Sequence, residues 1–200
     1  MATAAPSGKD PAAPPREMQP LPALLSFLVP GLGQIYQGRV GKGILFLVCI
    51  YALFFYGMWL GSGTVVAGEP PKTYHVSGNV FLPPAPDSAR QSNLPPLIND
   101  LYNRPQYIGQ FWVGLVAWPA LVQYYIYNPK DDANPPLLDF ERTPSNDARN
   151  AVENFGDKQL ELGWVYTVIA GVLNIMVIYD ALAGPAFLTP KAGPTRKATA

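Results

Sequence analysis

Apolar residues gather in four segments of this chain, and polar or proline-rich stretches separate the segments. The second segment, from Gly43 to about Ser62, contains no charged side chain between Ile44 and Leu60. A helix that crosses the hydrocarbon core of a bilayer needs roughly 20 predominantly apolar residues. This segment therefore predicts a membrane-spanning helix, and with it an integral membrane protein.

The first apolar segment, residues 21–37, is shorter and less regular. Pro22, Pro30, Gly31 and Gly33 interrupt it, and proline and glycine both weaken the interior of a helix. On its own the segment is a marginal span. Two interpretations stay open: a full crossing, and a re-entrant segment that returns to the side from which it came.

The third and fourth segments are longer. Residues 107–127 carry tyrosines at both ends, as expected for rings that sit at the two membrane interfaces, and Pro119 predicts a kink that a neighbouring helix can accommodate. Residues 162–184 are largely apolar up to the pair Gly184-Pro185, which stops a helix. Both segments predict spanning helices.

Polar stretches make up the rest of the chain. Residues 1–20 are rich in alanine and proline, residues 185–200 are short and basic, and both predict disordered tails. Residues 63–106 form a proline-rich loop in which Thr73–Phe81 suggests a short hairpin, and residues 128–161 form a charged loop with an amphipathic helix. The predicted fold is an all-α integral membrane protein with about four transmembrane helices and long polar loops.

The distribution of lysine and arginine bears on the orientation in the membrane. If all four segments span, both ends of the chain share a side that carries eight of the 14 lysines and arginines. Cytoplasmic loops carry the excess of these residues, so we expect four spans with both ends in the cytoplasm. The shortest loop, with Arg39 and Lys42, argues against that majority. If residues 21–37 are re-entrant, the count is again eight against six, with the opposite arrangement of the ends.

A glycine-rich turn, Pro30-Gly-Leu-Gly-Gln-Ile-Tyr-Gln-Gly38, joins the first two segments. Gly31, Gly33 and Gly38 allow backbone conformations that other residues resist, and glycines let two helices approach closely. Tyr36 is expected at the membrane interface. The turn therefore predicts a tight helical hairpin over residues 21–62, with spans at 21–37 and 43–62.

Arg39 and Lys42 follow this turn and are expected to face lipid headgroups. A second interpretation makes the turn a glycine loop that binds a phosphate or a lipid headgroup, with these two residues as counter-charges. The P-loop and dinucleotide-binding patterns are absent, and no strand precedes the turn.

The stretch VPGLGQIYQGRVGKGILFLV resembles the first half of the TM2 domain, a two-helix membrane hairpin. In that family the first helix ends in a glycine-rich turn with a tyrosine followed by glycine, and the second helix ends near an aspartate. Nothing comparable follows Leu60, so we assign the aspartate's role by conjecture to Asp180 in the fourth segment.

The start of the apolar region and the stretch GWVYTVIAGVLNIMVIYDALAGP together resemble DUF6677, a family of uncharacterised membrane proteins of planctomycete-type bacteria. The resemblance covers the first, second and fourth segments, and the third less clearly. It implies a multi-pass protein of the bacterial cytoplasmic membrane and supplies no catalytic residue to transfer.

The fourth segment holds a ridge of small residues. Gly163, Thr167 and Gly171 recur every four residues, and Asn174 continues the same face. Such a ridge lets helices approach closely in a membrane, and a polar side chain on it forms hydrogen bonds across the contact. We expect this face to pack against another helix, with a ligand site as the alternative.

Asp180 is the one acidic residue deep in an apolar segment. An ionisable group within a span is costly and indicates a functional site by default. Asp180 also lies about one turn before Gly184-Pro185, so it can reach the interface and pair with Arg39 or Lys42 if the fourth helix packs beside the hairpin. Structural pairing and a proton- or ion-handling role both stay open. Three glutamines in or near spans are expected to support packing: Gln34, Gln110 and Gln123.

Composition narrows the function classes. Charged residues make up 14% of the chain and the net charge is zero, which gives no basic face for nucleic acid. Cys49 has no second cysteine to pair with. His75 has no partners at metal-ligand spacing, and Asp131-Asp132 does not match an EF-hand. We therefore expect no metal, no cofactor and no enzymatic activity.

Two function hypotheses follow. The first is a non-enzymatic scaffold or accessory subunit that packs with itself or with another membrane protein, surrounded by lipids and without a nucleic-acid partner. The second is an oligomeric transporter or channel component for small solutes, ions or protons, motivated by Asp180, Asn174 and the glutamines.

Overall fold

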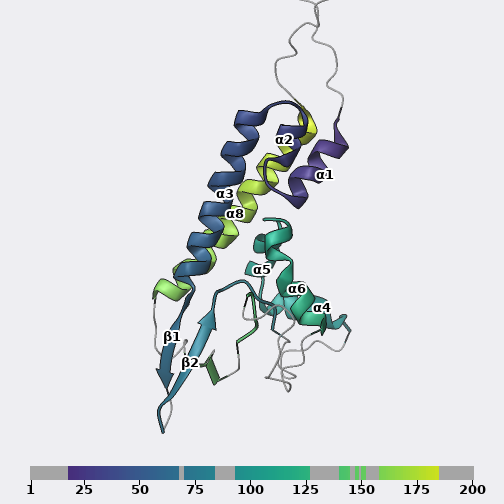
Figure 1. Ribbon diagram of the computed structural model, residues 1–200. Helices are drawn as coiled ribbons and strands as arrows, with labels where there is room; N and C mark the ends of the chain where they lie inside the picture. The colour runs from purple at the N-terminus through teal and green to yellow at the C-terminus, as the bar shows by residue number, and fades with distance from the viewer. Residues whose placement is uncertain are drawn as a thin grey trace, which may run out of the picture.

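Two long helices lie side by side and form the axis of the molecule (Figure 1). In this computed structural model α3 (Val40–Leu60) runs down the molecule and α8 (Lys158–Ala183) runs back up beside it. Both are long and apolar enough to cross a membrane, by length and composition. With 21 residues, α3 measures about 31 Å at about 1.5 Å per residue, close to the roughly 30 Å hydrocarbon core of a bilayer.

The upper end of the molecule, as drawn in Figure 1, holds the start of α3, and the lower end holds the start of α8.

Three predicted segments lie outside the described residues: the tail at residues 185–200, nearly all of the tail at 1–20, and most of the amphipathic helix in 128–161. The structure describes residues 18–67, 70–83, 93–126, 140–144, 147–148, 150–151 and 158–184.

A short helical hairpin, α1 (Pro20–Leu28) and α2 (Leu32–Tyr36), packs against the upper part of both long helices. The two ends of this hairpin lie together. Gln37, just after α2, donates a hydrogen bond from Nε2 to Oε1 of Gln19, just before α1, at 2.9 Å. With nine residues, α1 reaches about 14 Å at about 1.5 Å per residue, roughly half of the hydrocarbon core. Residues 21–37 therefore form a short helical hairpin whose two ends lie together, an arrangement that fits the re-entrant interpretation.

A second hairpin rises from the lower end and consists of α5 (Gln106–Phe111), η2 (Leu115–Ala117) and α6 (Pro119–Ile126). The chain reverses at Gly114, where φ is +97°, so the prediction of one spanning helix over residues 107–127 is wrong. Glycine adopts this left-handed conformation without the steric penalty that other residues meet. Pro119 begins α6 instead of kinking a long helix, because the first helical position needs no N–H.

The tips of the two hairpins meet partway along the long helices. The ring of Phe27, near the end of α1, packs against Phe111, Trp112 and Trp118 of the lower hairpin with centroids 5.5 to 5.9 Å apart. A Cβ atom at Gly114 would lie 2.7 Å from the Phe27 carbonyl oxygen. Aromatic contact and close backbone approach therefore join the hairpins.

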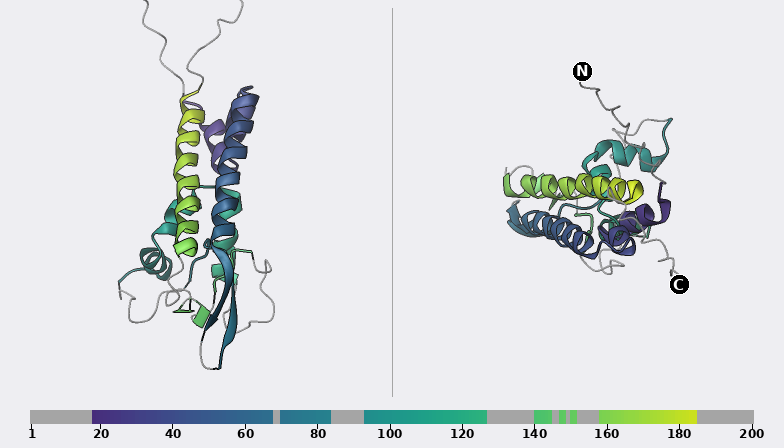
Figure 2. Two further views of the ribbon diagram at one scale, coloured as in Figure 1. Left: turned by 90° about the vertical axis from the view of Figure 1, so that its left-hand side faces the viewer. Right: turned by 90° about the horizontal axis from the view of Figure 1, so that it is seen from above.

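A β-hairpin projects below the lower end of α3 (Figure 2). Strand β1 (Ser62–Ala67) pairs antiparallel with β2 (Lys72–Ser77). The fold is therefore not entirely α-helical. The hairpin predicted within Thr73–Phe81 begins earlier, because residues 73–77 are its second strand and pair with Ser62–Ala67. The short helix α4 (Pro96–Asn103) follows near the lower end.

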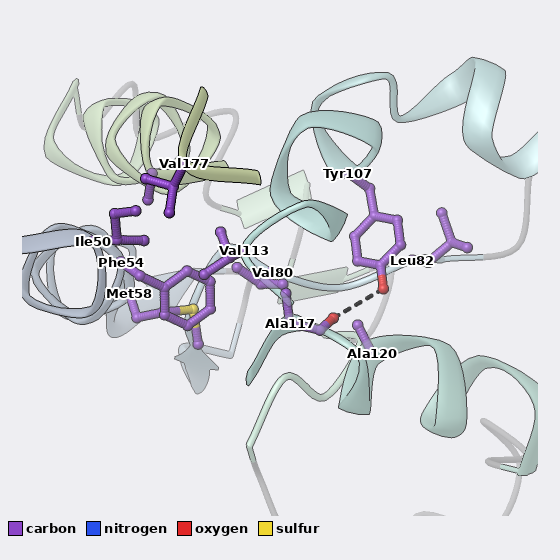
Figure 3. Close-up of a cluster of buried hydrophobic side chains, with 11 residues drawn as sticks. Ile50, Phe54, Met58, Val80, Leu82, Tyr107, Val113, Ala117, Ala120 and Val177 are labelled. Carbon is purple, nitrogen blue, oxygen red and sulfur yellow. Dashed lines mark hydrogen bonds between the residues drawn. The ribbon is translucent and has the colours of Figure 1, made fainter. Parts of the chain in front are cut away.

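The largest buried apolar cluster lies where α3, α8 and the lower hairpin meet (Figure 3). Phe54 has no exposed surface, and Tyr107 projects toward Leu82 while its hydroxyl donates to the Ala117 carbonyl oxygen at 3.0 Å. The members are Ile50, Phe54, Met58, Val80, Leu82, Tyr107, Val113, Ala117, Ala120, Ala170 and Val177.

The prediction of about four spanning helices therefore holds only in part. Among the described residues, two helices meet the length and composition of a span. The other two apolar segments are each broken into short helices by a glycine with positive φ, at Gly31 and at Gly114.

Candidate functional site: the inward face of α8

One face of α8 carries small and polar residues and is buried along most of the helix. Gly163, Thr167, Gly171 and Asn174 are all buried there. Their spacing of three or four residues places them on one side of an α-helix. They contact α1, α3, α5 and the segment after β2 of the same chain, so the ridge predicted from the sequence packs inside the chain.

At the lower end of this face, α8 and α3 approach closely. A Cβ atom on Gly163 would lie 2.7 Å from the Gly57 carbonyl oxygen and 2.5 Å from Asn79 Nδ2. Asn79 Nδ2 donates to the same Gly57 oxygen at 2.9 Å. Only a residue without a side chain at position 163 leaves room for this bond.

A buried polar cluster continues from Asn79. The Thr167 hydroxyl accepts a hydrogen bond from Gln110 Nε2 at 2.8 Å and lies 3.3 Å from Asn79 Oδ1. Arg104 donates from Nη2 to the Asn79 carbonyl oxygen at 2.7 Å, with its guanidinium over the ring of Phe81. The cluster ties α8, the lower hairpin and the segment after β2 together.

At the middle of α8, Asn174 joins both hairpins. Its Nδ2 donates to the Ser26 carbonyl oxygen at 3.1 Å and to the Trp112 carbonyl oxygen at 2.8 Å. Ser26 needs an outside donor because the residue four positions later is Pro30, which has no N–H. Trp112 is the C-cap of α5, where carbonyls lose their helical partners. One side chain therefore caps the ends of both α1 and α5.

Gly171 lies between the Thr167 and Asn174 contacts. A Cβ atom there would collide with the Gly109 carbonyl oxygen of α5. The absence of a side chain thus lets α5 rest directly on α8, and this contact sets the height of the lower hairpin.

At the upper end, Asp180 holds the loop between α2 and α3. Lys42 Nζ lies 2.6 Å from Asp180 Oδ1, and Arg39 Nη2 lies 2.9 Å from Oδ2. The sequence left this pairing conditional on the last helix packing beside the hairpin, and the structure brings all three residues together. Their side chains are 21% (Arg39), 39% (Lys42) and 30% (Asp180) exposed. Two cations and one anion give the site a net charge of +1.

Gln34 connects this ion pair to the interior. Its Nε2 donates to Asp180 Oδ2 at 3.1 Å and to the Val177 carbonyl oxygen at 2.9 Å, and its Oε1 accepts from Ser26 Oγ at 3.0 Å. Gln34 and Ser26 have no exposed surface. Hydrogen bonds therefore link Asp180 to Ser26, the residue whose carbonyl Asn174 caps.

The glycine-rich stretch contains two turns with α2 between them. Gly31 has φ +83°, and a Cβ there would collide with the Gly43 carbonyl oxygen of α3. A Cβ on Gly33 would collide with the Pro22 carbonyl oxygen of α1. The single interhelical turn expected from the sequence is thus a compact helix–turn–helix in which glycines allow three helices to touch. Tyr36, at the end of α2, is 63% exposed.

Gly38 ends α2 with a hydrogen-bond pattern that needs a left-handed residue. Its φ is +79°, its N–H donates to the Ile35 carbonyl at 2.9 Å, and the Arg39 N–H donates to the Gln34 carbonyl at 2.8 Å. This pair of bonds is the Schellman motif, with glycine in its usual place. The motif directs Arg39 toward Asp180.

Glu141 is a buried carboxyl group that the sequence did not single out. It is 1% exposed, its φ is +54°, and its Oε2 accepts a hydrogen bond from the Ala120 N–H of α6 at 2.9 Å. Burial raises the pKa of Glu141 to about 9. At neutral pH the group is therefore protonated and caps α6 as a neutral acid.

Sequence reasoning also missed Ser26, Asn79 and Arg104. Ser26 carries a signal in hindsight, since Pro30 four residues later leaves its carbonyl without a helical donor. Asn79 and Arg104 lie in a loop whose path gives no periodic pattern, so only the fold brings them to α8. His75 lies exposed on β2, and within the described ranges no group of three or more histidine, cysteine or acidic residues is placed to hold a metal ion.

Comparison with known proteins supports an assignment to a family. Residues 21–194 match DUF6677, a family of unknown function. The chain belongs to this family. Over 30 residues it is also 57% identical to the uncharacterised protein MJ1516 of Methanocaldococcus jannaschii, a stretch that covers 15% of this chain and 30% of that protein. No solved structure matches the chain at a significant level. The DUF6677 match extends over every helix and strand described above, apart from Pro20 at the start of α1.

Proposed function

We propose that this DUF6677 protein is embedded in a membrane by α3 and α8, with α1–α2 and α5–α6 entering from opposite faces. The main support for the proposal is that apolar side chains face outward on α3 and α8 while polar side chains are buried, the reverse of a soluble protein. Of the apolar window of each long helix, 28% is buried in α3 and 33% in α8, whereas the core helix of a soluble protein is mostly buried. Soluble monomers rarely expose apolar patches of more than a few hundred Å².

The polar side chains complete this inversion. Ser26, Gln34, Gln110, Thr167 and Asn174 have no exposed surface. In a bilayer no water satisfies such groups, so they are expected to turn inward and bond to one another. The outward faces instead carry Ile44, Leu45, Val48 and Phe55 on α3, and Val172, Leu173, Ile175 and Met176 on α8.

Membrane extraction tests this location. The protein should remain in the membrane pellet after alkaline carbonate treatment and dissolve only in detergent. Release into the carbonate supernatant as a folded monomer would overturn the proposal, because a peripheral or soluble protein behaves in that way.

Within the membrane, we propose a non-enzymatic role as a scaffold or accessory subunit. The polar side chains on the inward face of α8 make intramolecular hydrogen bonds, Asn174 through its Nδ2 and not its Oδ1. Because Gly163 and Gly171 contact α3 and α5 of the same chain, a second copy or another membrane protein would bind the outward faces of the long helices. Arg39 and Lys42 would face phosphate-bearing headgroups with the net charge of +1 left by Asp180.

The test of this role is the composition of the complex in its native membrane. A tagged protein purified in mild detergent should carry a reproducible membrane-protein partner or a second copy. Crosslinking through the outward face of α8, for example at Met176→Cys, should trap the same species. A lone chain in both experiments would contradict the scaffold role.

A transporter or channel component is the second candidate, favoured by one specific observation. Polar groups follow the inward face of α8 from the partly exposed Asp180 to the buried Asn174 and Thr167. Ionisable and polar residues at membrane depth often line a solute path. Asp180→Asn should then reduce ion or proton flux in reconstituted vesicles, and unchanged flux would eliminate this candidate.

A further inference from the structure

The short helix α4 buries its charged residue and exposes several apolar ones, while Leu97 and Leu101 also pack inward on the apolar core and Asn103 is exposed. Asp100 is its only charged residue and is fully buried, where it accepts a hydrogen bond from the Tyr124 hydroxyl at 2.6 Å. Asn99, beside it, is 4% exposed. A helix on the water-exposed surface of a protein turns such residues outward and its apolar residues inward.

The outward face of α4 carries an apolar stripe instead. Leu94, just before the helix, is 38% exposed, Ile98 is 47% exposed and Tyr102 is 71% exposed. These residues recur every four positions and therefore line one side of the helix. The stripe holds no charge.

The stripe is close to other outward apolar surface. On α6, Gln123 is 2% exposed, while Val122, Tyr125 and Ile126 are 42%, 68% and 66% exposed. The bond from Tyr124 to Asp100 joins α6 to α4. Both helices lie near the level at which α3 and α8 reach their lower ends (Figure 1). The neighbouring helices α4 and α6 therefore both expose apolar residues near this level.

We propose that the Leu94–Ile98–Tyr102 stripe of α4 lies in the boundary between headgroups and acyl chains of the lower leaflet. The inference rests on the proposed membrane location of α3 and α8. Interfacial helices bury an apolar face there by about 5–10 Å, and tyrosine prefers this depth because its ring is apolar and its hydroxyl is polar. Because Asn99, Asp100 and the inward leucines hold α4 against the protein, the helix needs no basic residues to hold it at the surface.

A partner protein would be the other occupant of such a face, and the absence of charge favours lipid. The stripe offers no ion pair to select a partner. The neighbouring α5 and α6 also expose apolar residues that a bilayer would cover. Ile108 on α5 and Leu115 on η2 are also about half exposed, at 51% and 48%.

Site-specific fluorescence in vesicles tests the proposal. Starting from Cys49→Ser, single cysteines at Ile98→Cys and Tyr102→Cys carry an environment-sensitive dye in phosphatidylcholine vesicles that contain spin-labelled lipid. Val172→Cys on α8 is the control for lipid contact, and Thr64→Cys on β1 is the control for water. Both control residues are exposed in the chain.

The dye at position 98 should emit at shorter wavelength than the dye at 64. It should be quenched more strongly by lipid labelled near the headgroup than by lipid labelled near the chain end. Quenching of position 98 by an aqueous quencher to the same degree as position 64, with position 172 quenched by lipid, would overturn the interfacial role of α4 and leave the membrane location intact. Aqueous quenching at 172 as well would overturn both proposals.

Discussion

At the scale of single residues, the fold depends on polar side chains that replace backbone partners. Asn174 caps the ends of α1 and α5 at once, and Gln34 links Ser26 to Asp180. Each lost partner leaves a buried carbonyl or amide without a hydrogen bond, at a cost of about 1–3 kcal/mol. Stability should therefore respond more to these residues than to the larger apolar ones on the outward faces.

Asn174→Leu tests this view, since leucine has a similar volume and no donor. Two buried carbonyls would lose their partner, so we expect a loss of about 2–5 kcal/mol, measured as a lower unfolding midpoint in detergent. Met176→Leu is the matched control, because Met176 is 66% exposed on the same helix. Equal midpoints for Asn174→Leu and wild type would contradict the capping role.

Glu141 gives the stability a predictable pH dependence. Its pKa is raised from 4.5 to about 9 by burial, so the folded state holds the proton more tightly than the unfolded state. Its stabilising contribution is full below about pH 4.5 and is lost progressively as the pH rises toward 9, by up to about 1.4 kcal/mol per pH unit.

Glu141→Gln should remove this dependence while keeping an oxygen to accept from the Ala120 N–H. Unfolding midpoints measured from pH 5 to pH 9 should fall in the wild type and stay flatter in the variant. Asp147→Asn, which removes an exposed carboxylate from the same stretch of chain, should follow the wild type. A parallel decline in all three proteins would rule out Glu141 as the origin.

Gly38 should tolerate only residues that adopt the left-handed conformation. Its Cβ would meet no atom within 4 Å, so backbone strain alone decides the outcome. Gly38→Ala should cost roughly 1–2 kcal/mol, and Gly38→Asn less, because asparagine visits this conformation more readily. Equal unfolding midpoints for both variants and the wild type would show that the Schellman turn does not constrain this loop.

At the scale of elements, the sequence predicts the continuous helices well and the broken ones poorly. The length and the lack of charge of two segments predict them as helices: Val40–Leu60 and the apolar part of α8. Residues 107–127 also lack charged side chains, but Gly114 reverses the chain there, and nothing local distinguishes a reversing glycine from one in a packed helix. The reversal depends on contact with α1, which is distant in the sequence.

The contact between α5 and α8 can be tested through Gly171. A side chain there would meet the Gly109 carbonyl oxygen, so Gly171→Leu should destabilise the folded chain itself. The sequence alone had associated this position with assembly. Gly41→Ala is the control, since a Cβ on Gly41 meets nothing within 4 Å. A Gly171→Leu protein with an unaltered unfolding midpoint but weakened crosslinking would favour an intermolecular role.

At the scale of the whole molecule, the proposed membrane arrangement has two crossings and two re-entrant hairpins in place of the four crossings expected from the sequence. The start of α1, the loop before α3 and the end of α8 meet at the upper end, where the Gln19 N–H donates to the Leu182 carbonyl at 2.9 Å. The candidate site was partly predictable: Asp180, Arg39 and Lys42 could be proposed as partners from charge alone. Asn79 and Ser26 could not, because their roles depend on the path of the hairpins.

The most direct test of this topology is the sidedness of three single cysteines in a Cys49→Ser background. Met18→Cys, Gly41→Cys and Thr64→Cys would be labelled with an impermeant reagent in oriented membrane vesicles. Our account predicts that positions 18 and 41 react from one side and position 64 from the other. Reaction of positions 18 and 41 from opposite sides would mean that residues 21–37 cross the membrane, and would contradict the re-entrant fold.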